Sequence, residues 1–170
     1  MEFFDLAQKR FAARGFLDKK VEDDKLNKVL EAGRIAPTAK NNQPQVIYVL
    51  RSEEALKKIN EVSPCIFNST TVLMICCNTD LCWHSDDLKY DSQSMDVSIV
   101  CTHMMLEATD LGLDSCWVLR FDREKATKLF NLPGNIKPQC LLPIGYKKED
   151  TVPSPRHFDR KPLSETVIEL

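Results

Sequence analysis

The sequence predicts a single globular domain that mixes helices and strands, in the α/β or α+β class. A chain of 170 residues is most simply one domain with room for a hydrophobic core. Segments with helical periodicity alternate with short β-prone runs through the middle of the chain. The apolar fraction is 43% and the charged fraction 28%, as in ordinary soluble proteins. These observations leave the choice between the two classes, and the sheet topology, open.

Three helices and two strands are expected in the first half of the chain. Residues 3–13 should form a helix with phenylalanine side chains on one face. A second helix should be capped by Asp23 or Asp24 and end before Pro37, because proline disfavours helical geometry in the residue that precedes it. The other elements are a strand over residues 46–50, a helix from Ser52, and a continuous apolar strand over residues 70–77, covered on both faces.

A long buried helix dominates the expected second half. Residues 95–111 are apolar almost all round this helix, which indicates burial on several sides. In a chain this short, a second subunit could supply part of that burial. Gly112 suits the end of the helix. Strands are expected over residues 116–119 and 139–146, separated by a helix that Asp122 can cap.

Two further segments do not fit the core pattern. Residues 78–93 are polar and irregular, and Trp83 and Tyr90 in this segment could form a lid over a ligand or pack onto the domain. Residues 147–170 contain three prolines, at positions 153, 155 and 162. This tail could be disordered, or it could cross onto a partner subunit. It carries basic residues at Arg156, Arg160 and Lys161.

Composition and charge narrow the possible partners and compartment. The formal net charge is -2 and the pI about 5.9, so no nucleic acid or anionic membrane is expected as a partner. No segment approaches the roughly 20 apolar residues of a membrane-spanning helix, and the first residues do not read as a secretory signal. Seven cysteines, an odd number without framework spacing, favour a reducing cytoplasm.

The sequence shows no recognisable motif for nucleotide binding, for metal binding or for a catalytic nucleophile. The five glycines lie far apart, so the phosphate of any bound nucleotide must be held by side chains. Cys77, Cys82 and His84 are too loosely spaced for a zinc site, and no metal is expected. No cysteine–histidine pair shows a nucleophile signature, and His103 is expected to be a hydrogen-bonded core histidine.

Four segments, in order along the chain, resemble the nitroreductase-like family of FMN-dependent, NAD(P)H-oxidising flavoproteins. Residues 9–14, KRFAAR, resemble the family's R-x-S-x-R turn. Residues 36–44, APTAKNNQP, are similar to the A-P-S-A-x-N-x-Q-P loop along the flavin, and this match is the most specific. Residues 96–118 resemble the long dimer helix with its following strand, and residues 143–163 the last sheet strand and phosphate-binding arm.

The resemblance implies an α+β fold, a three-layer sandwich with a mainly antiparallel central sheet. Two chains would form a homodimer through a helical interface. Residues 1–170 would be one FMN-binding domain, with residues 147–170 as a domain-swapped C-terminal arm that reaches the partner. Two FMN sites would lie at the interface, and each would draw residues from both chains.

The same resemblance assigns the cofactor-binding residues. Phosphate contacts fall to Arg10 and Arg160, with Lys161 and Arg156 as rivals, because the planar guanidinium suits bidentate phosphate contact. Arg14 would reach the ribityl chain or the pyrimidine edge. The full cofactor set is Arg10, Phe11, Ala12, Arg14, Pro37, Thr38, Ala39, Asn41, Leu119, Arg120, Arg160 and Lys161.

Three residues depart from the family pattern. Ala12 stands where serine is usual, which removes one hydroxyl donor, and a neutral hydrogen bond contributes about 0.5–1.5 kcal/mol. Weaker FMN binding is therefore expected. Arg120 stands where glycine is common, and it could crowd the ring or select anionic substrates. Gln45 replaces a frequent tryptophan in one wall of the pocket.

The expected function is that of an NAD(P)H-dependent flavin oxidoreductase. Hydride would pass from NAD(P)H through flavin N5 to an electron-poor small-molecule acceptor, such as a nitroaromatic or quinone, in a ping-pong reaction. No catalytic acid–base residue is needed, because the cofactor carries the chemistry. The alternatives are an FMN-binding sensor or carrier with little turnover, and a flavin-free dimer that serves interaction alone.

Overall fold

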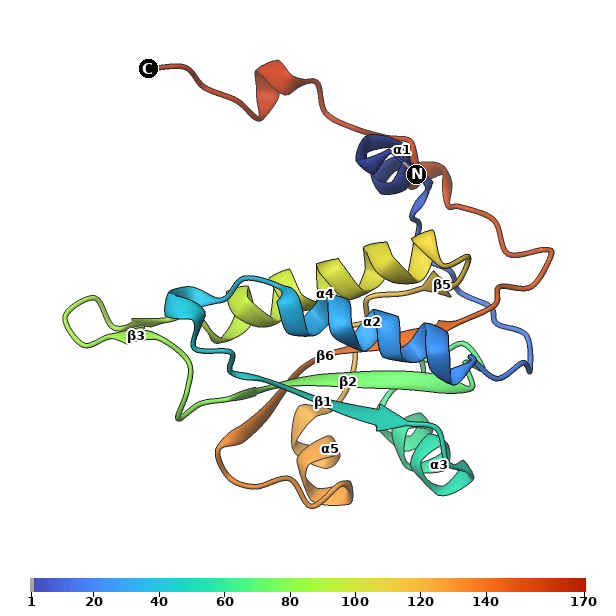
Figure 1. Ribbon diagram of the computed structural model, residues 1–170, viewed down its shortest axis with the longest axis horizontal. Helices are drawn as coiled ribbons and strands as arrows, with labels where there is room; N and C mark the ends of the chain where they lie inside the picture. Colours follow the sequence, from blue (N-terminus) through green and yellow to red (C-terminus); the bar gives the residue numbers. More distant parts are fainter. Residues whose placement is uncertain (1) are drawn as a thin grey trace.

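The computed structural model describes residues 2–170 and contains a four-stranded antiparallel sheet (Figure 1). The strand order is β1-β2-β6-β5, and each neighbouring pair is antiparallel. A separate hairpin is formed by β3 and β4. The bounds are β1 Gln45–Leu50, β2 Thr71–Asn78, β3 His84–Ser85, β4 Tyr90–Asp91, β5 Asp114–Ser115 and β6 Ile136–Gly145. This sheet confirms the α+β class implied by the resemblance.

Helices cover both faces of the sheet and complete three layers (Figure 1). Helices α2 and α4 lie on one face, and α3 and α5 lie on the other. The bounds are α1 Phe3–Lys9, α2 Asp23–Ile35, α3 Glu53–Val62, α4 Gln93–Asp110 and α5 Arg123–Leu129, with short 3-10 turns at Ala39–Asn41, Pro155–His157 and Leu163–Glu165.

Strand β2 forms the centre of the hydrophobic core. Its first seven residues are all buried, which confirms the prediction of a strand covered on both faces. Because side chains alternate along a strand, Leu73 and Ile75 pack in the cluster with α2 and α4. Val72 and Met74 pack in the second cluster, with α3 and α5. One strand therefore joins two separate cores.

Two predicted helix caps are present, and one is not. The side chain of Ser52 accepts from the backbone N–H of Ala55 at 3.2 Å, at the start of α3. Asp122 accepts from the N–H of Lys125 at 2.9 Å, at the start of α5. The prediction that Asp23 or Asp24 caps α2 is wrong, because both lie inside its first turn.

The first helix is shorter than predicted. It ends at Lys9, and the segment that follows is extended. The backbone N–H of Ala13 donates to the carbonyl of Ser115 at 3.0 Å, and Ala12 forms a parallel bridge to the same residue. This pairing with a distant segment replaces helical hydrogen bonds, and it determines the position of the basic residues described below.

The predicted strand over residues 116–119 is also interrupted. Cys116 donates its N–H to the carbonyl of Pro143 at 3.1 Å, but proline has no N–H with which to return the bond. Regular pairing therefore stops after β5, and Val118 rejoins β6 only as an isolated bridge to Leu141. Gly112, with φ of +74°, follows α4 as predicted.

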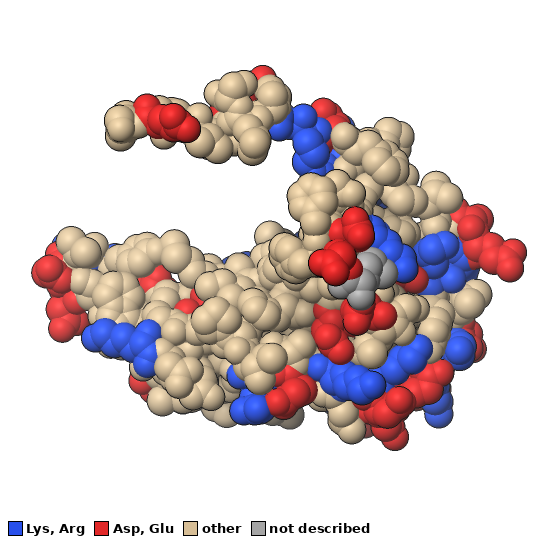
Figure 2. Space-filling model, turned by 45° about the horizontal axis from the view of Figure 1, so that its top comes forward, with Lys and Arg blue, Asp and Glu red and all other residues tan. Residues whose placement is uncertain are grey.

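The C-terminal arm, residues 147–170, extends away from the body of the domain from residue 151 onward (Figures 1 and 2). Residues 166–168, a strand-like run of Thr, Val and Ile, form no strand in the described chain. Leu163 and Ile168 are 77% and 83% exposed. The crossing of this arm onto a second chain stays a prediction. Within residues 2–170, no helix has the length and apolar character to span a membrane.

Candidate functional site

Two arginines from the segment after α1 lie beside β5. The pairing of Ala12 and Ala13 with Ser115 places Arg10 and Arg14 near Cys116. Burial raises the pKa of the Cys116 thiol, and the positive charges of Arg14 and Arg10 oppose that increase. The arginines therefore place positive charge at this edge of the sheet.

Neither arginine has a carboxylate partner within ion-pair distance in residues 2–170. Arg10 is half-buried and Arg14 is exposed, so both guanidinium groups are accessible to a ligand. Two uncompensated guanidinium groups suit an anion, and the planar fork of each can bind a phosphate through two hydrogen bonds. This part of the predicted site fits the phosphate end of FMN. The hydroxyl group missing at Ala12 is not supplied by the neighbouring Ala13.

The predicted flavin loop, residues 36–44, has an unusual backbone. Lys40, Asn41 and Gln43 have φ values of 51°, 56° and 51°, in the left-handed region that is rare for residues with a side chain. Local hydrogen bonds support this conformation: the N–H of Gln43 donates to Thr38 Oγ1 at 3.0 Å. The loop is therefore held in a defined shape, with Asn41 exposed on it.

Asp96, in the first turn of α4, anchors this loop. Its Oδ1 accepts from the backbone N–H of Ala39 at 2.8 Å, and its Oδ2 accepts from Ser92 Oγ at 2.6 Å. Ser92 Oγ in turn accepts from the N–H of Trp83 at 3.1 Å. The carboxylate is only 2% exposed. It therefore joins the flavin loop to the segment that contains the β3–β4 hairpin.

Sequence reasoning did not identify Asp96 as a site residue. The signal was present, because a carboxylate at the start of an apolar helix needs hydrogen-bond donors when it is buried. The hairpin itself carries the predicted lid aromatics, and the rings of Trp83 and Tyr90 meet edge to face at 6.2 Å between centroids. Their role as a lid stays a prediction.

Leu119 and Arg120 follow the Val118 bridge and lie at the surface. The carbonyl of Arg120 accepts from Ser63 Oγ at 2.7 Å, which fixes the backbone here. Leu119 is 62% exposed and lines a cavity of about 280 Å³ together with Trp117. Trp117 Nε1 is buried and has no hydrogen-bond acceptor within the described residues.

The C-terminal arm approaches the phosphate end of the site through its contact with α1. His157 Nε2 lies 3.1 Å from the carbonyl of Gln8, and its ring meets Phe11 at 6.3 Å between centroids. Arg160 Nη1 donates to the carbonyl of Asp159 at 2.8 Å, and Lys161 pairs with Glu165 at 3.6 Å. Both side chains thus bind within the arm. Their phosphate contacts stay a prediction.

The predicted site residues occupy separate places around α4 within one chain. The flavin loop is tied to the first turn of α4, whereas Arg10 and Arg14 lie beyond its last turn, beside β5 (Figure 1). Because α4 has 18 residues, it is about 27 Å long. Leu119 lines a cavity together with Ser94 and Ser98, which lie on nearly the opposite side of the helix from Asp96. One chain therefore does not bring the whole predicted set together.

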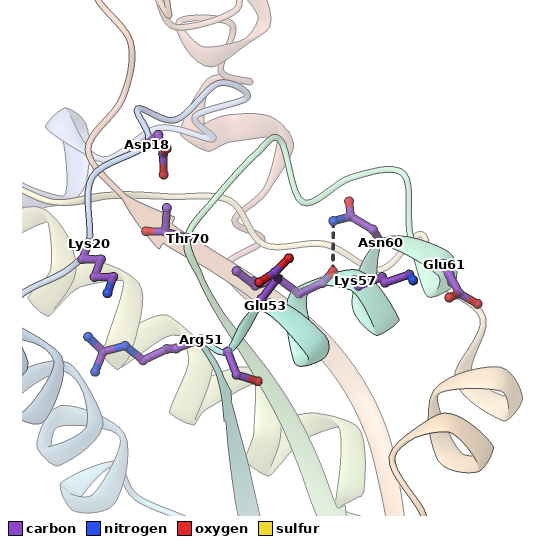
Figure 3. A pocket seen from close by; sticks show the side chains of 10 residues that line it. Asp18, Lys20, Arg51, Glu53, Lys57, Asn60, Glu61 and Thr70 are labelled. Atoms are coloured by element: carbon purple, nitrogen blue, oxygen red, sulfur yellow. Dashed lines mark hydrogen bonds between the residues drawn. The ribbon is translucent and has the colours of Figure 1, made fainter.

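A larger cavity, of about 1030 Å³, lies apart from these residues, between α3 and the segments that precede α2 and β2 (Figure 3). Its charged side chains are balanced in sign, since three are basic and three are acidic. The charge indicates no particular class of ligand, and none of the predicted cofactor residues lines the cavity. The charged residues are Asp18, Lys20, Arg51, Glu53, Lys57 and Glu61.

Comparisons with known proteins agree on one family. A model of the nitroreductase family matches residues 7–70 and 66–146. A crystal structure of a nitroreductase family protein from Clostridium difficile 630 has 38% identity and a TM-score of 0.93, and the match covers 99% of this chain and 98% of that one. An Archaeoglobus fulgidus protein with the provisional name NADH dehydrogenase/NAD(P)H nitroreductase is 29% identical over 83% of both chains.

A further solved structure has the same fold. It is described as an FMN-dependent nitroreductase from Clostridium difficile R20291, and its TM-score is 0.76 at 23% identity. The match covers 92% of this chain and 95% of that one.

Proposed function

The chain belongs to the nitroreductase family, and we propose that it is an FMN-dependent oxidoreductase that uses NAD(P)H to reduce an electron-poor small molecule. The observation that carries this proposal is the pair of guanidinium groups of Arg10 and Arg14, which have no carboxylate partner in the described chain. The names of relatives support it, since one is named for NAD(P)H and another for FMN.

Two copies of the chain would build each site. Arg10 and Arg14 of one copy would hold the phosphate and the pyrimidine edge, and Leu119 with Arg120 would lie near N5. The loop at residues 37–41 would come from the second copy, because within one chain it lies at the other end of α4. The C-terminal arm would complete the phosphate site, with Arg160, Lys161 or Arg156 as the contact.

Bound FMN would supply reversible hydride transfer at N5, from NAD(P)H to a nitroaromatic or quinone acceptor in turn. The residues of this chain would bind and orient the cofactor and exclude water from the ring. Arg14 would stabilise negative charge at the pyrimidine edge, since it is a cation without a carboxylate partner. No side chain needs to act as a general acid or base.

Exposed apolar side chains support the homodimer. Phe3 and Phe4 on α1 are 69% and 70% exposed, and Met95 on α4 is 55% exposed. Large exposed apolar side chains are typical of surfaces that bind another protein. The seven cysteines, all present as free thiols, support a reducing, cytoplasmic setting.

One observation favours a second candidate function, an FMN-binding sensor or carrier with little turnover. Ala12 is exposed beside Arg10 and Arg14 and offers no hydroxyl group to a phosphate. A hydrogen bond to a charged phosphate contributes about 1.5–3 kcal/mol, so its loss weakens binding by about ten- to a hundredfold. The oxidoreductase remains the better proposal, because both guanidinium groups are still present.

A visible absorption spectrum of the purified protein tests the proposed function. We expect flavin bands, either copurified or after addition of FMN, that bleach when NADH or NADPH is added without oxygen. Oxidation by a quinone should restore the bands. Bound FMN that neither nucleotide reduces would favour the sensor or carrier, and a protein that binds no FMN would contradict both candidates.

A further inference from the structure

A continuous groove opens beside Leu119. It combines the cavity of about 280 Å³ described above with an adjoining one of about 460 Å³, and the two share Arg123 and Gln139. The first cavity contains Leu119 at its rim, and the second is lined by Lys128 and Lys137. We call this feature the basic groove and define it by Arg123, Lys128, Lys137 and Gln139.

A β-bulge in β6 shapes the floor of the basic groove. Ile75 pairs with Cys140 and Cys76 pairs with Pro138, so Gln139 is an extra residue on its strand. Bulges turn side chains out of the regular ladder and are frequent beside active sites. Here the carbonyl of Gln139 accepts from Arg123 Nη2 at 3.2 Å, which fixes the guanidinium at the junction of the two cavities.

The basic groove carries an excess of positive charge. Arg123, Lys128 and Lys137 are all exposed, and none of them forms an ion pair within residues 2–170. Glu124 is the one acidic residue among the groups that line the two cavities. At the Leu119 end, Trp117 Nε1 adds a buried N–H without an acceptor. Three cations therefore stand against one carboxylate among the residues that line the two cavities.

We propose that the basic groove binds an anionic group, a phosphate or carboxylate, of the substrate that reaches the cofactor beside Leu119. This inference rests on the proposed function, which places Leu119 near the reacting ring. Cations bind phosphate and carboxylate through charge-assisted hydrogen bonds. Two substrates could carry the group: NADPH through its 2′-phosphate, or an acceptor through a carboxylate. The groove would then select between NADPH and NADH, or between charged and neutral acceptors.

The test uses two charge variants of the FMN-loaded protein. Lys128→Glu/Lys137→Glu reverses the charge of the groove, and Lys128→Gln/Lys137→Gln only neutralises it. Arg123 is kept because it binds the carbonyl of Gln139. Lys28→Glu, at an exposed position of α2, is the matched control for a change of surface charge. Since both groove lysines are exposed, the variants should fold like the wild type.

Two measurements distinguish the possible sources of the anion. Calorimetric titration compares 2′,5′-ADP with 5′-AMP, which lacks the 2′-phosphate. Steady-state kinetics with NADH compares the KM for 4-nitrobenzoate with that for nitrobenzene. In the Glu variant we expect either the affinity for 2′,5′-ADP to fall about tenfold or the KM for 4-nitrobenzoate to rise about tenfold, with a smaller effect in the Gln variant. The affinity for 5′-AMP and the KM for nitrobenzene should stay within about twofold of the wild type. In the Lys28→Glu control, all four values should stay within the same range.

The probe that changes identifies the substrate. A selective loss of 2′,5′-ADP binding assigns the groove to NADPH, and a selective rise in the KM for 4-nitrobenzoate assigns it to the acceptor. The proposal is overturned if both anionic probes stay within about twofold of the wild type. FMN affinity, measured by quenching of flavin fluorescence, is determined separately on every variant. A wild-type protein without FMN affinity would contradict the proposed function, whereas 2′,5′-ADP titration would still decide whether the groove binds anions.

Discussion

Single residues determine how the flavin loop is held. Three non-glycine residues in this loop have positive φ, and each such residue costs about 1 kcal/mol or more. Asp96 offsets this cost, since it accepts hydrogen bonds from the backbone of Ala39 and from the hydroxyl of Ser92. Its position in the first turn of α4 also suits a negative charge, because the N-terminus of a helix is electropositive.

Asp96→Ala is expected to lower the free energy of unfolding by about 2 kcal/mol or more, because two buried donors lose their acceptor. FMN affinity should fall by a larger factor than in Glu107→Ala, a change on the same helix away from the loop. Urea denaturation and flavin fluorescence measure the two effects. Wild-type FMN affinity in Asp96→Ala would show that the loop does not contribute to cofactor binding.

Asp114 gives a prediction for pH dependence. Burial raises the pKa of its carboxyl, although Lys147 and Lys9 oppose the shift. A raised pKa means that the folded state holds this proton more tightly than the unfolded state does. The carboxyl therefore favours folding when the pH is below its unfolded pKa of 3.8, and this contribution is lost as the pH rises through the folded pKa. Asp114→Asn should therefore stabilise the protein by less than about 1 kcal/mol at pH 7, and by almost nothing at pH 3. Thermal denaturation at the two pH values measures this, and equal effects at both would contradict it.

At the scale of elements, the contact between α2 and α4 depends on Gly33. A β-carbon at this position would lie 2.7 Å from Sδ and 2.9 Å from Cγ of Met104, which is fully buried. The two helices can approach this closely only because residue 33 has no side chain. The close contact keeps α2 against the long helix, and the flavin loop begins directly after α2.

Gly33→Ala is expected to destabilise the protein by about 1 kcal/mol or more, even though alanine favours a helix by about that amount. The overpacked Met104 side chain is the cause, so Met104→Val in the Gly33→Ala background should recover part of the loss. Chemical denaturation of the single and double variants measures this coupling. Additive effects in the double variant would contradict the explanation.

The burial of strand β2 should make its two cysteine thiols unreactive. Burial is the largest cause that raises the pKa of both Cys76 and Cys77, to about 12 in each case. At pH 8 these two cysteines should therefore resist iodoacetamide in the folded protein and react only after denaturation. Cys65, which is half-buried on a loop, should react first. Mass spectrometry of the alkylated peptides gives the order, and early labelling of Cys76 would contradict the structure.

At the scale of the whole molecule, the proposed site needs two copies and the C-terminal arm. A chain cut after Asp150 should therefore lose FMN affinity and part of its dimer, because in the proposed site the arm would supply both the phosphate contact and an apolar surface. Leu163→Glu/Ile168→Glu changes only the exposed apolar side chains of the arm and should weaken the dimer without removing Arg160. Light scattering coupled to size exclusion gives the mass. An arm-deleted dimer with normal FMN affinity would contradict this role.

The sequence predicts most of the fold, but the boundaries depend on distant partners. The buried strand, the start of a helix at Ser52 and the cap at Asp122 follow from local pattern, and the structure confirms them, with the buried residues at 71–77. The end of α1 does not, because the chain leaves the helix to pair with Ser115 more than 100 residues later. Local helix propensity contains no information about that partner.

Candidate site residues can be named from the sequence where they form a local motif. Residues that come together only in the folded chain are harder to name. Arg10 and Arg14 were predicted from the resemblance of residues 9–14 to the family's R-x-S-x-R turn, and their contact with a phosphate stays a prediction. The basic groove could not be recognised, since Arg123 and Lys137 are 14 positions apart and meet through a bulge in β6. A bulge depends on strand register, which single-sequence patterns do not specify.

The order of the strands has a consequence for synthesis. Strand β6 lies between β2 and β5 and contributes side chains to both hydrophobic clusters, but it is the last strand to be made. Until residue 145 has left the ribosome, one edge of β2 has no strand to pair with. Both hydrophobic clusters also lack the side chains that β6 contributes. Exposed apolar edges of this kind promote aggregation of unfinished chains. The nascent protein is therefore expected to depend on chaperones until β6 inserts, and to fold in one late step.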